Sequence, residues 1–570
     1  MKKILSAVCS AFIMNSFFYL NNISNIFAED FIQQAENCEL IGCSVENYGS
    51  GYEGNGYVKF TNSIGDGINY SINGEGKYSD ITIRYSQGSE ADQTLSLFVN
   101  SKFVQKVNFP STDEWDTSWS SVKVPVYLSE GNNNIELKYT EGDGIVDIDY
   151  IQHEERTNSI KMVIIPHEDD EIFSFCGSIQ NMLENGDDVK VVLLTNGDYY
   201  STQIGKDRLM ESVEALKCLD FPKEKIIALG YGDSIISDLY DASPDTIIPV
   251  SNGYHSNDKT YGNYENNIYD YHKVQTGSEA SYTRYNLVSD LENVISANMP
   301  AEIYTTSFYD GHADHSATYK FVEEAIDNIR ETQKYTPLLH ESIVHGDDSE
   351  NPWPEQYSSY DPAPEAIPFT NPFPNNDRPL YWENVTKINL TPNMLENKYT
   401  AISKYVSQMS WPDFNYSFYK SDEFYWTRNY ANIAPYATIE VSSDTPDTGQ
   451  VKEKVADRIV AGYDMNISEY YEWAANDETV GAWIKLEFDE SHAVNKIVLN
   501  DRVTTVDNIV SARLDFSDGS SIIVSDIPAN GTDCIVDFDT KNITWVKLTV
   551  LEATGYNVGL TEFQIIEAQE

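Results

Sequence analysis

Short stretches that alternate apolar and polar residues occur near both ends of the chain. They are separated by Gly, Asn and Asp residues, and they include residues 80–85, 95–99, 482–488 and 511–516. A period of two is typical of strands with one buried face, and closely spaced short strands indicate a β-sandwich. We therefore predict an N-terminal β-sandwich over residues 29–156 and a C-terminal β-sandwich over residues 429–570.

The centre of the chain has a different pattern, in which apolar runs alternate with segments of helical period. Residues 190–194 and 225–229 are apolar runs of strand length, and residues 206–219 between them place Leu and Val on one helical face. Alternating strands and helices favour a parallel sheet covered by helices. The predicted fold class is therefore multidomain, with a central α/β Rossmann-like parallel-sheet domain over residues 157–428 between the two β-sandwich domains.

Two central segments break this pattern. Residues 232–285 form a polar insertion rich in Tyr and Asn, and residues 345–380 are rich in proline. Long irregular loops inside a compact domain are usually functional. We expect the insertion to border a binding site and the proline-rich segment to be irregular.

The first residues have the features of an export signal. Two lysines precede an apolar stretch over residues 4–20, and Ala28 offers a small residue for cleavage. This pattern predicts a signal peptide over residues 1–28 and a secreted, extracellular protein without stable membrane insertion; the alternative is an anchoring helix. Five of the six cysteines would remain after cleavage. Of these, Cys38 and Cys43 either pair or are two buried thiols.

The chain is strongly acidic. Its net charge is −52, from 90 acidic and 38 basic residues. A phosphate backbone would be repelled, so we expect no nucleic-acid partner. The excess carboxylates either form a solvated surface or, in part, bind hard cations such as Ca²⁺.

Two distant polar groups, each following an apolar run, offer the ligands of a metal site. His167 and Asp170 follow the run at residues 162–166, and His315 follows the run at residues 303–308. Sites in open α/β sheets form beyond the carboxyl ends of strands. Two imidazoles and one carboxylate leave a position for water on Zn²⁺ or another divalent metal. We predict that His167, Asp170 and His315 bind this metal.

The neighbours of these ligands suggest catalytic roles. Asp169 is placed to take a proton from water as general base. His312 could stabilise an oxyanion or protonate a leaving nitrogen, and Asp314 could orient an imidazole. The alternative interpretation is a solvated acidic run, because either motif alone is a weak signal.

The two motifs together resemble those of the PIG-L/LmbE zinc-dependent deacetylases of N-acetylated sugars. The family pattern is His-Pro-Asp-Asp-Glu followed by His-x-Asp-His, and here the first motif has Glu168 in place of proline. The resemblance covers about residues 158–425. It implies metal binding by His167, Asp170 and His315, a base at Asp169 and assistance by His312.

Two further residues are candidates for substrate binding. His255 lies in the polar insertion, and Arg208 belongs to an Arg-x-x-Glu motif that also resembles the family. The alternatives are a solvent-facing loop for His255 and a buttressing role for Arg208.

The flanking domains resemble carbohydrate-binding domains. Residues 29–155 are similar to modules of families 6 and 35, which implies a structural Ca²⁺ between Glu36 and Asp149 and sugar stacking on Trp115 and Trp119 unless those rings belong to the core. Residues 432–568 resemble the discoidin, or coagulation-factor type, sandwich, with or without sugar binding.

The whole arrangement is similar to that of bacterial N-acetylgalactosamine deacetylases. The resemblance implies a secreted zinc-dependent deacetylase that acts on a host glycan, such as a blood group A or mucin-type structure. The alternatives are an N-acetylglucosamine deacetylase acting on another glycan and a multivalent carbohydrate-binding adhesin with an inactive central domain.

Overall fold

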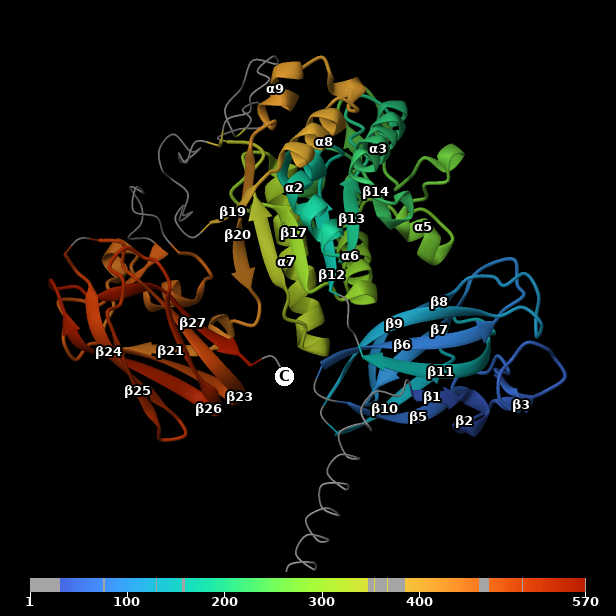
Figure 1. Ribbon diagram of the computed structural model, residues 1–570, viewed down its shortest axis with the longest axis horizontal. Helices are drawn as coiled ribbons and strands as arrows, with labels where there is room; N and C mark the ends of the chain where they lie inside the picture. Colours follow the sequence, from blue (N-terminus) through green and yellow to red (C-terminus); the bar gives the residue numbers. More distant parts are fainter. Residues whose placement is uncertain are drawn as a thin grey trace, which may run out of the picture. The chain divides into compact units, whose positions relative to one another are not determined.

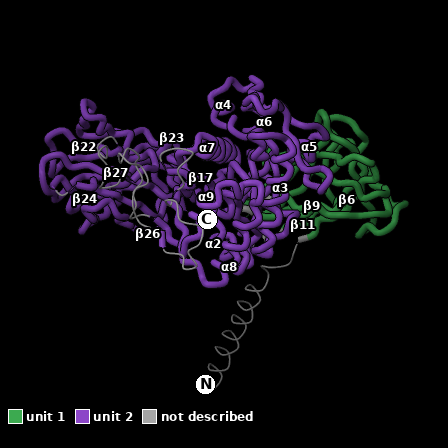
Figure 2. The backbone as a smooth tube through the Cα atoms, turned by 90° about the horizontal axis from the view of Figure 1, so that it is seen from above, with its two compact units in different colours: residues 1–157 green, residues 158–570 purple. Residues whose placement is uncertain are grey.

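The structure is a computed structural model that describes most of the chain after the predicted signal peptide. The described residues are 31–74, 77–129, 131–155, 159–346, 353, 366–367, 385–460, 471–504 and 506–568. The signal peptide predicted over residues 1–28 and most of the proline-rich segment lie outside them. The chain divides into two compact units, residues 1–157 and 158–570 (Figure 2).

The first unit is a sandwich of two antiparallel sheets. One sheet has the order β3-β4-β11-β6-β9, with β1 also paired to β11. Its strands are β1 (Phe31–Gln34), β3 (Ser44–Glu46), β4 (Tyr57–Lys59), β6 (Lys77–Ser86), β9 (Ser120–Leu128) and β11 (Asp147–Glu155). The other sheet, in spatial order, contains β2 (Glu39–Ile41), β5 (Gly67–Gly74), β10 (Gly131–Lys138), β7 (Gln93–Val99) and β8 (Lys102–Phe109).

The alternating pattern explains this sandwich. Ile81, Ile83 and Tyr85 are buried at every second position of β6, as the period of two requires. They share one apolar core with Leu95 and Leu97 of the opposite sheet. The first unit is thus β-rich, as the sequence predicts.

The centre of the second unit is a mixed sheet rather than the wholly parallel sheet that the sequence predicts (Figure 1). In spatial order its strands are β14 (Ile226–Tyr231), β13 (Asp188–Thr195), β12 (Ile160–Ile165), β17 (Glu302–Thr306), β18 (Leu338–Ser342), β20 (Asp422–Asn429) and β19 (Thr386–Asn389). Pairing is parallel from β14 to β18 and antiparallel from β18 to β19. The prediction is therefore right for the α/β core and wrong for the two strands at this edge.

Helices cover the sheet. They include α2 (Asp170–Glu184), α3 (Thr202–Leu216), α6 (Arg284–Asn298), α7 (Ala313–Gln333), α8 (Pro392–Ile402) and α9 (Pro412–Ser417). Side chains of α2, α3 and α8 share an apolar core with β12 and β13, and α6 packs against α7. Within this core Phe173 of α2 stacks on Phe418, with ring centroids 4.3 Å apart.

A buried ion pair connects α8, β20 and α2. Lys398 Nζ lies 2.7 Å from Glu423 Oε1 and donates a second hydrogen bond to the carbonyl oxygen of Phe173. Glu423 Oε2 accepts from the backbone N–H of Gly177 at 2.9 Å. Because both charged side chains are almost fully buried, their hydrogen bonds are needed to offset the cost of desolvation.

The polar insertion has regular structure of its own. It contains α4 (Ile236–Asp241), the short hairpin strands β15 (Val250–Ser251) and β16 (Ser256–Asn257), and α5 (Tyr271–Thr276).

No helix among the described residues is both long and apolar enough to cross a membrane. The cysteines in the described part of the chain, including Cys38 and Cys43, are free thiols.

The C-terminal part of the second unit is also β-rich. Its sheet has the order β22-β27-β23-β26-β24-β25, with β21 paired to β23. The strands are β21 (Thr438–Val441), β22 (Trp473–Ala474), β23 (Trp483–Asp501), β24 (Ile509–Phe516), β25 (Ser521–Ser525), β26 (Cys534–Ala553) and β27 (Gly559–Glu567). Trp473 is fully buried in its core.

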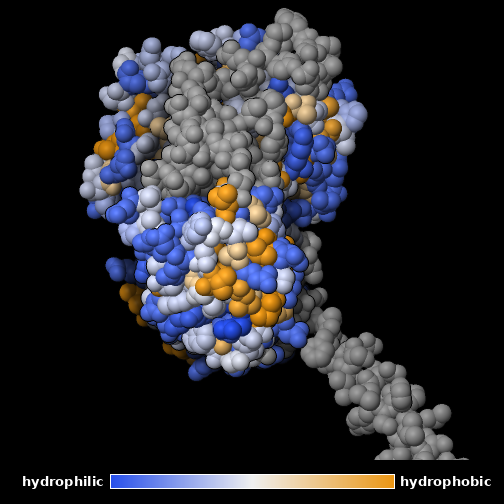
Figure 3. Space-filling model, turned by 90° about the vertical axis from the view of Figure 1, so that its left-hand side faces the viewer, coloured by the Kyte–Doolittle hydropathy of each residue, from blue (hydrophilic) through white to orange (hydrophobic). Residues whose placement is uncertain are grey.

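Figure 3 shows apolar side chains gathered on an outer face of this C-terminal region. Its large exposed apolar residues include Val510, Ile523 and Ile535.

Candidate active site

The parallel strands bring several polar segments to one edge of the sheet. His167 follows β12, Asp233 follows β14, Asp310 follows β17 and His345 follows β18. Parallel strands point their carboxyl ends to the same edge, so residues far apart in sequence meet there. These four side chains are buried.

His167, Asp170 and His315 converge. His167 Nδ1 lies 3.1 Å from His315 Nε2 and 3.5 Å from Asp170 Oδ2. His315 Nε2 lies 3.4 Å from the same Asp170 oxygen. Asp170 is the first residue of α2, so the start of this helix and the end of β12 fix both groups of the first motif.

This triangle fits a tetrahedral metal. Ligands about 2.0–2.1 Å from a tetrahedral zinc lie about 3.3–3.4 Å from one another. The separations of 3.1, 3.5 and 3.4 Å match this spacing. Two imidazole nitrogens and one carboxylate oxygen are also the donor types of catalytic zinc sites. The structure therefore contains a possible His/Asp metal-binding group.

Asp310 orients His315. Its Oδ2 lies 3.3 Å from His315 Nδ1, which leaves Nε2 free to face His167 and Asp170. The carboxylate is fixed by backbone N–H groups of Val344 (2.7 Å) and His345 (3.1 Å) on Oδ2 and of His312 (2.9 Å) on Oδ1. Carboxylates in this position set the tautomer and direction of metal-binding imidazoles.

Asp314 and Asp233 lie on the other side of His167. Asp314 Oδ2 is 3.4 Å and Asp233 Oδ1 is 3.3 Å from His167 Nε2. These three residues could also hold a metal by proximity. However, the Asp314 oxygens already accept backbone N–H bonds from Ser234 (2.7 Å) and Ile236 (3.1 Å), which suits a group that orients His167. Asp170 Oδ2 likewise accepts a backbone N–H bond, from His167 at 3.1 Å, so the assignment of Asp170 rather than Asp233 and Asp314 as a metal ligand stays a prediction.

His312 caps α7 and has a defined tautomer. Its Nδ1 accepts the backbone N–H of Asp314 at 3.2 Å, so the proton of the neutral ring is on Nε2. Burial, together with the neighbouring His167, lowers the pKa of His312 to about 4. The ring is therefore neutral near pH 7 and presents one N–H donor, with its centroid 4.9 Å from those of His167 and His315.

Asp169 is held in a strained conformation. Its φ of 142° lies in a region that non-glycine residues rarely adopt, and such strain is concentrated at functional sites. Arg208 Nη2 lies 3.3 Å from Asp169 Oδ2 and donates to the carbonyl oxygen of Glu168 at 3.0 Å. Burial and the adjacent Asp170 raise the pKa of Asp169 to about 8, while Arg208 opposes this change.

Gly197 allows Arg208 and Glu168 to approach the site. A Cβ atom at Gly197 would lie 2.5 Å from Glu168 Oε2 and 2.6 Å from the guanidinium carbon of Arg208, and the residue has a φ of 56°. Glu168, which stands where the resembling family has proline, is fully buried. Burial raises the pKa of Glu168 well above its usual range, and Arg208 lowers it.

The two candidates for substrate binding lie at different depths. Arg208 is largely buried among Glu168, Asp169 and Asp233, which makes it a support of the site in this structure. His255 lies on the hairpin of the insertion, where its Nε2 contacts the carbonyl oxygen of Asp198. Asp198 in turn accepts the backbone N–H of Asp233 at 2.9 Å. His255 is therefore connected to the candidate active site through Asp198 and Asp233.

Sequence reasoning missed Asp233, Asp310 and His345. His345 is buried with its ring centroid 4.8 Å from that of His315 and 5.2 Å from that of His312. Burial and the neighbouring His315 lower the pKa of His345 to about 3. The only signal available in the sequence was their position after strands, and the strand before His345 was not predicted.

The calcium candidates of the first unit lie around one loop. Asp149 accepts the backbone N–H of Glu53 at 3.0 Å, and Glu36 accepts that of Asn55 at 2.8 Å. Buried Glu36 Oε2 and Gln34 Oε1 have no hydrogen-bond partner among the described residues, but Asp149 is also paired with the guanidinium of Arg84. Calcium binding by Glu36 and Asp149 stays a prediction.

The two tryptophan candidates are both half-buried. Trp119 packs 5.3 Å from Tyr57 between ring centroids and donates from Nε1 to the carbonyl oxygen of Ser50 at 2.9 Å. Trp115 has the ammonium of Lys59 5.7 Å from its ring centroid. Trp119 is thus tied into its surroundings, and sugar stacking by either ring stays a prediction.

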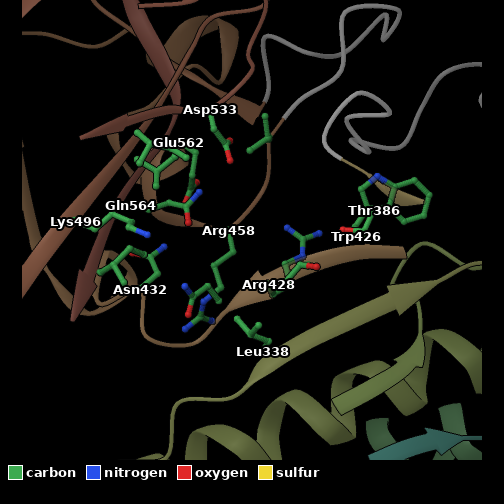
Figure 4. Close-up of a pocket in the computed structure, with 16 residues that line it drawn as sticks. Leu338, Thr386, Trp426, Arg428, Asn432, Arg458, Lys496, Asp533, Glu562 and Gln564 are labelled. Carbon is green, nitrogen blue, oxygen red and sulfur yellow. The ribbon is translucent and has the colours of Figure 1, made fainter. Parts of the chain in front are cut away.

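A separate cavity lies between β20 and the C-terminal sandwich, next to the residue that begins β18 (Figure 4). Its volume is about 390 Å³, and its lining includes Leu338, Trp426, Arg428, Arg458 and Glu562. Leu338 begins β18, whereas the histidine cluster follows the end of that strand. At about 3.3 Å per residue, these positions are more than about 13 Å apart, so the cavity is distinct from the candidate active site.

Family models match three segments of the chain. Residues 162–326 match the model described as GlcNAc-PI de-N-acetylase (PIG-L), and residues 34–155 match carbohydrate binding module (family 6). Residues 432–566 match a domain of unknown function, DUF7402. These matches support a carbohydrate de-N-acetylase domain joined to a carbohydrate-binding module.

Similar proteins cover only short parts of the chain. It is 34% identical over 119 residues to cycloisomaltooligosaccharide glucanotransferase of Niallia circulans, covering 20% of this chain and 12% of that protein. It is 31% identical over 119 residues to endo-1,4-beta-xylanase B of Cellvibrio japonicus, covering 20% of each protein. The chain thus spans a fifth or less of the length of these relatives.

The solved structures that are similar to this chain also cover less than a quarter of it. A family 35 carbohydrate binding module from Clostridium thermocellum is 27% identical and covers 23% of this chain and 100% of that one, with a TM-score of 0.21. A family 35 module in complex with a disaccharide containing glucuronic acid is 26% identical and covers 22% and 94%, also with a TM-score of 0.21.

Proposed function

We propose that the protein is a secreted, metal-dependent carbohydrate deacetylase. It would hydrolyse the N-acetyl group of an N-acetylhexosamine to give the free amino sugar and acetate. The observation that carries this proposal is the triangle of His167 Nδ1, Asp170 Oδ2 and His315 Nε2, with Asp169 and His312 beside it. The match to a de-N-acetylase family over residues 162–326 supports the reaction type.

His167, Asp170 and His315 would hold the metal. When bound, a zinc ion there would polarise the acetamide carbonyl and lower the pKa of a bound water. Asp310 and Asp314 keep the two imidazoles in the required direction.

The remaining residues would carry the proton transfers. Asp169 would take the proton of the water that attacks the acetamide carbon, acting as general base, because the positive charge of a metal held by the adjacent Asp170 would lower the pKa of the Asp169 carboxyl from its raised value. The Nε2–H of His312 would donate a hydrogen bond to the carbonyl oxygen as negative charge develops on it. The C–N bond then breaks, and the proton held by Asp169 is available for the leaving amine.

N-Acetylgalactosamine is the leading substrate in this proposal, as in blood group A or mucin-type glycans, and N-acetylglucosamine is the alternative. The family 6 module over residues 34–155 would hold the enzyme on the glycan and raise the local substrate concentration. The strongly negative net charge favours neutral glycans over anionic ones.

A panel of acetylated glycans, analysed by mass spectrometry, tests the proposal. Each turnover should remove the mass of one acetyl group and create a free amine, and the glycans that react would identify the sugar. Binding to glycans without any loss of acetate, by protein loaded with zinc, would instead indicate a carbohydrate-binding adhesin with an inactive central domain.

A further inference from the structure

Three exposed tyrosines form a cluster beside the candidate active site. Tyr199 and Tyr200 lie between β13 and α3, and Tyr254 lies at the turn between β15 and β16. They are 38%, 58% and 63% exposed. Their ring centroids are 5.0 Å (Tyr199 and Tyr200), 5.7 Å (Tyr199 and Tyr254) and 5.0 Å (Tyr200 and Tyr254) apart. We call these three residues the tyrosine platform.

The platform is anchored from both sides. Asn252 Nδ2 donates to the carbonyl oxygen of Tyr199, and Asn252 Oδ1 accepts the backbone N–H of Tyr254 at 3.1 Å. His255, next to Tyr254, contacts the carbonyl oxygen of Asp198, next to Tyr199. The insertion hairpin is therefore tied to the loop after β13, and the three rings are held together although solvent reaches each of them.

A short chain of contacts joins the platform to His167. Asp198 is fully buried, and its Oδ1 accepts the backbone N–H of Asp233 at 2.9 Å. Asp233 Oδ1 is 3.3 Å from His167 Nε2. Because Tyr199 directly follows Asp198, the platform is connected to the metal-site histidine through two residues, Asp198 and Asp233.

We propose that the tyrosine platform is a glycan subsite that stacks on the sugar residue next to the one that loses its acetyl group. This inference rests on the proposed deacetylase function. Pyranose rings have apolar C–H faces, and tyrosine offers an apolar ring with a polar tip that suits partly wet contacts. The substrate class is therefore an oligosaccharide rather than a free monosaccharide, and the net charge of −52 favours a neutral one.

The test compares long and short substrates with a Tyr200→Ala/Tyr254→Ala double variant in the full chain. The substrates are two pairs: N-acetylgalactosamine with the blood group A trisaccharide, and N-acetylglucosamine with its β-1,4-linked trimer. We expect kcat/KM for the reactive oligosaccharide to fall at least tenfold, mainly through a higher KM, because stacking on the neighbouring sugar residue is lost. Turnover of the matching monosaccharide should stay within about twofold of the unaltered protein.

Two controls separate stacking from general damage. The Tyr200→Phe/Tyr254→Phe variant keeps the rings and should retain most oligosaccharide activity. Tyr556→Ala removes a similarly exposed tyrosine (76%) from the C-terminal sandwich and should change neither substrate's kinetics.

The outcomes distinguish the two levels of the proposal. An unchanged kcat/KM for the oligosaccharide in the double Ala variant, or an equal loss for both lengths of substrate, would overturn the platform while leaving the deacetylase function intact. Absence of acetate release from every substrate by the unaltered, zinc-loaded protein would overturn the proposed function itself, and the platform with it.

Discussion

Replacing Asp310 by Asn should weaken metal binding without removing any metal ligand. The Asp310 carboxylate faces His315 Nδ1 at 3.3 Å and accepts three backbone N–H groups. Every group around it is thus a donor, whereas the Asn side chain has only one acceptor oxygen and places an NH₂ against another donor. The imidazole would lose the negative charge that fixes its tautomer.

The expected magnitude follows from this geometry. Loss of a carboxylate that orients a metal-binding histidine typically lowers metal affinity by about 10- to 100-fold, which corresponds to about 1.4–2.7 kcal/mol. We therefore expect the zinc dissociation constant of Asp310→Asn to rise by about 10- to 100-fold.

Competition between the protein and a chromophoric chelator for zinc measures this constant. Asp245→Asn, at an exposed position of the same domain, makes the same change in charge and should bind zinc as the unaltered protein does. Circular dichroism should show that both variants are folded. Wild-type zinc affinity in folded Asp310→Asn would refute the assignment of Asp310 and weaken the case for His315 as a ligand.

Three further predictions concern catalysis and stability. Asp169→Ala should abolish acetate release while zinc stoichiometry, measured by atomic absorption, stays at that of the unaltered protein; retained turnover would remove Asp169 from the role of base. Lys398→Ala should lower the free energy of unfolding by about 3–5 kcal/mol in urea titrations, because it leaves Glu423 buried without its cation, and a loss below about 1 kcal/mol would contradict this. Burial raises the pKa of Asp147 from 3.8 to about 8, so its contribution to stability is greatest below about pH 4 and is lost as the pH rises to about 8. Asp147→Asn should therefore be more stable than the unaltered protein by about 2 kcal/mol or more at pH 8 but not at pH 4, and equal pH profiles in thermal melts would disprove this.

Local patterns predicted the local structure well. The alternating stretches at residues 80–85 and 511–516 lie within β6 and β24, and the apolar run at residues 190–194 lies within β13. These elements follow from side-chain period alone, because one face of each strand is buried. The helix start at Asp170 likewise follows from polar residues placed directly after a strand.

The antiparallel edge of the central sheet could not be predicted in the same way. β20 pairs with β18 across more than 80 residues of chain, and the pairing direction depends on the path of the intervening segment rather than on the residues of either strand. A short apolar strand looks the same in sequence whether its neighbour runs parallel or antiparallel. The sequence therefore indicated the α/β class but not the mixed order.

The same distinction applies to the candidate active site. His167 and Asp170, and His312 and His315, are close in sequence and form recognisable pairs. Asp310, by contrast, is a single acidic residue in a chain that has 90 of them. Its role arises because the loops after β17 and β18 bring three backbone N–H groups and an imidazole to one carboxylate. That convergence is a property of the topology, and no local pattern encodes it.

The metal site is tested most directly by acetate release from an acetylated glycan by one protein sample, measured before chelation, after chelation and after return of zinc. Chelation should abolish acetate release, one equivalent of zinc should restore it, and Asp170→Ala should not be restored by the same addition. Undiminished acetate release by the chelated protein, verified as free of metal, would contradict a metal site at His167, Asp170 and His315.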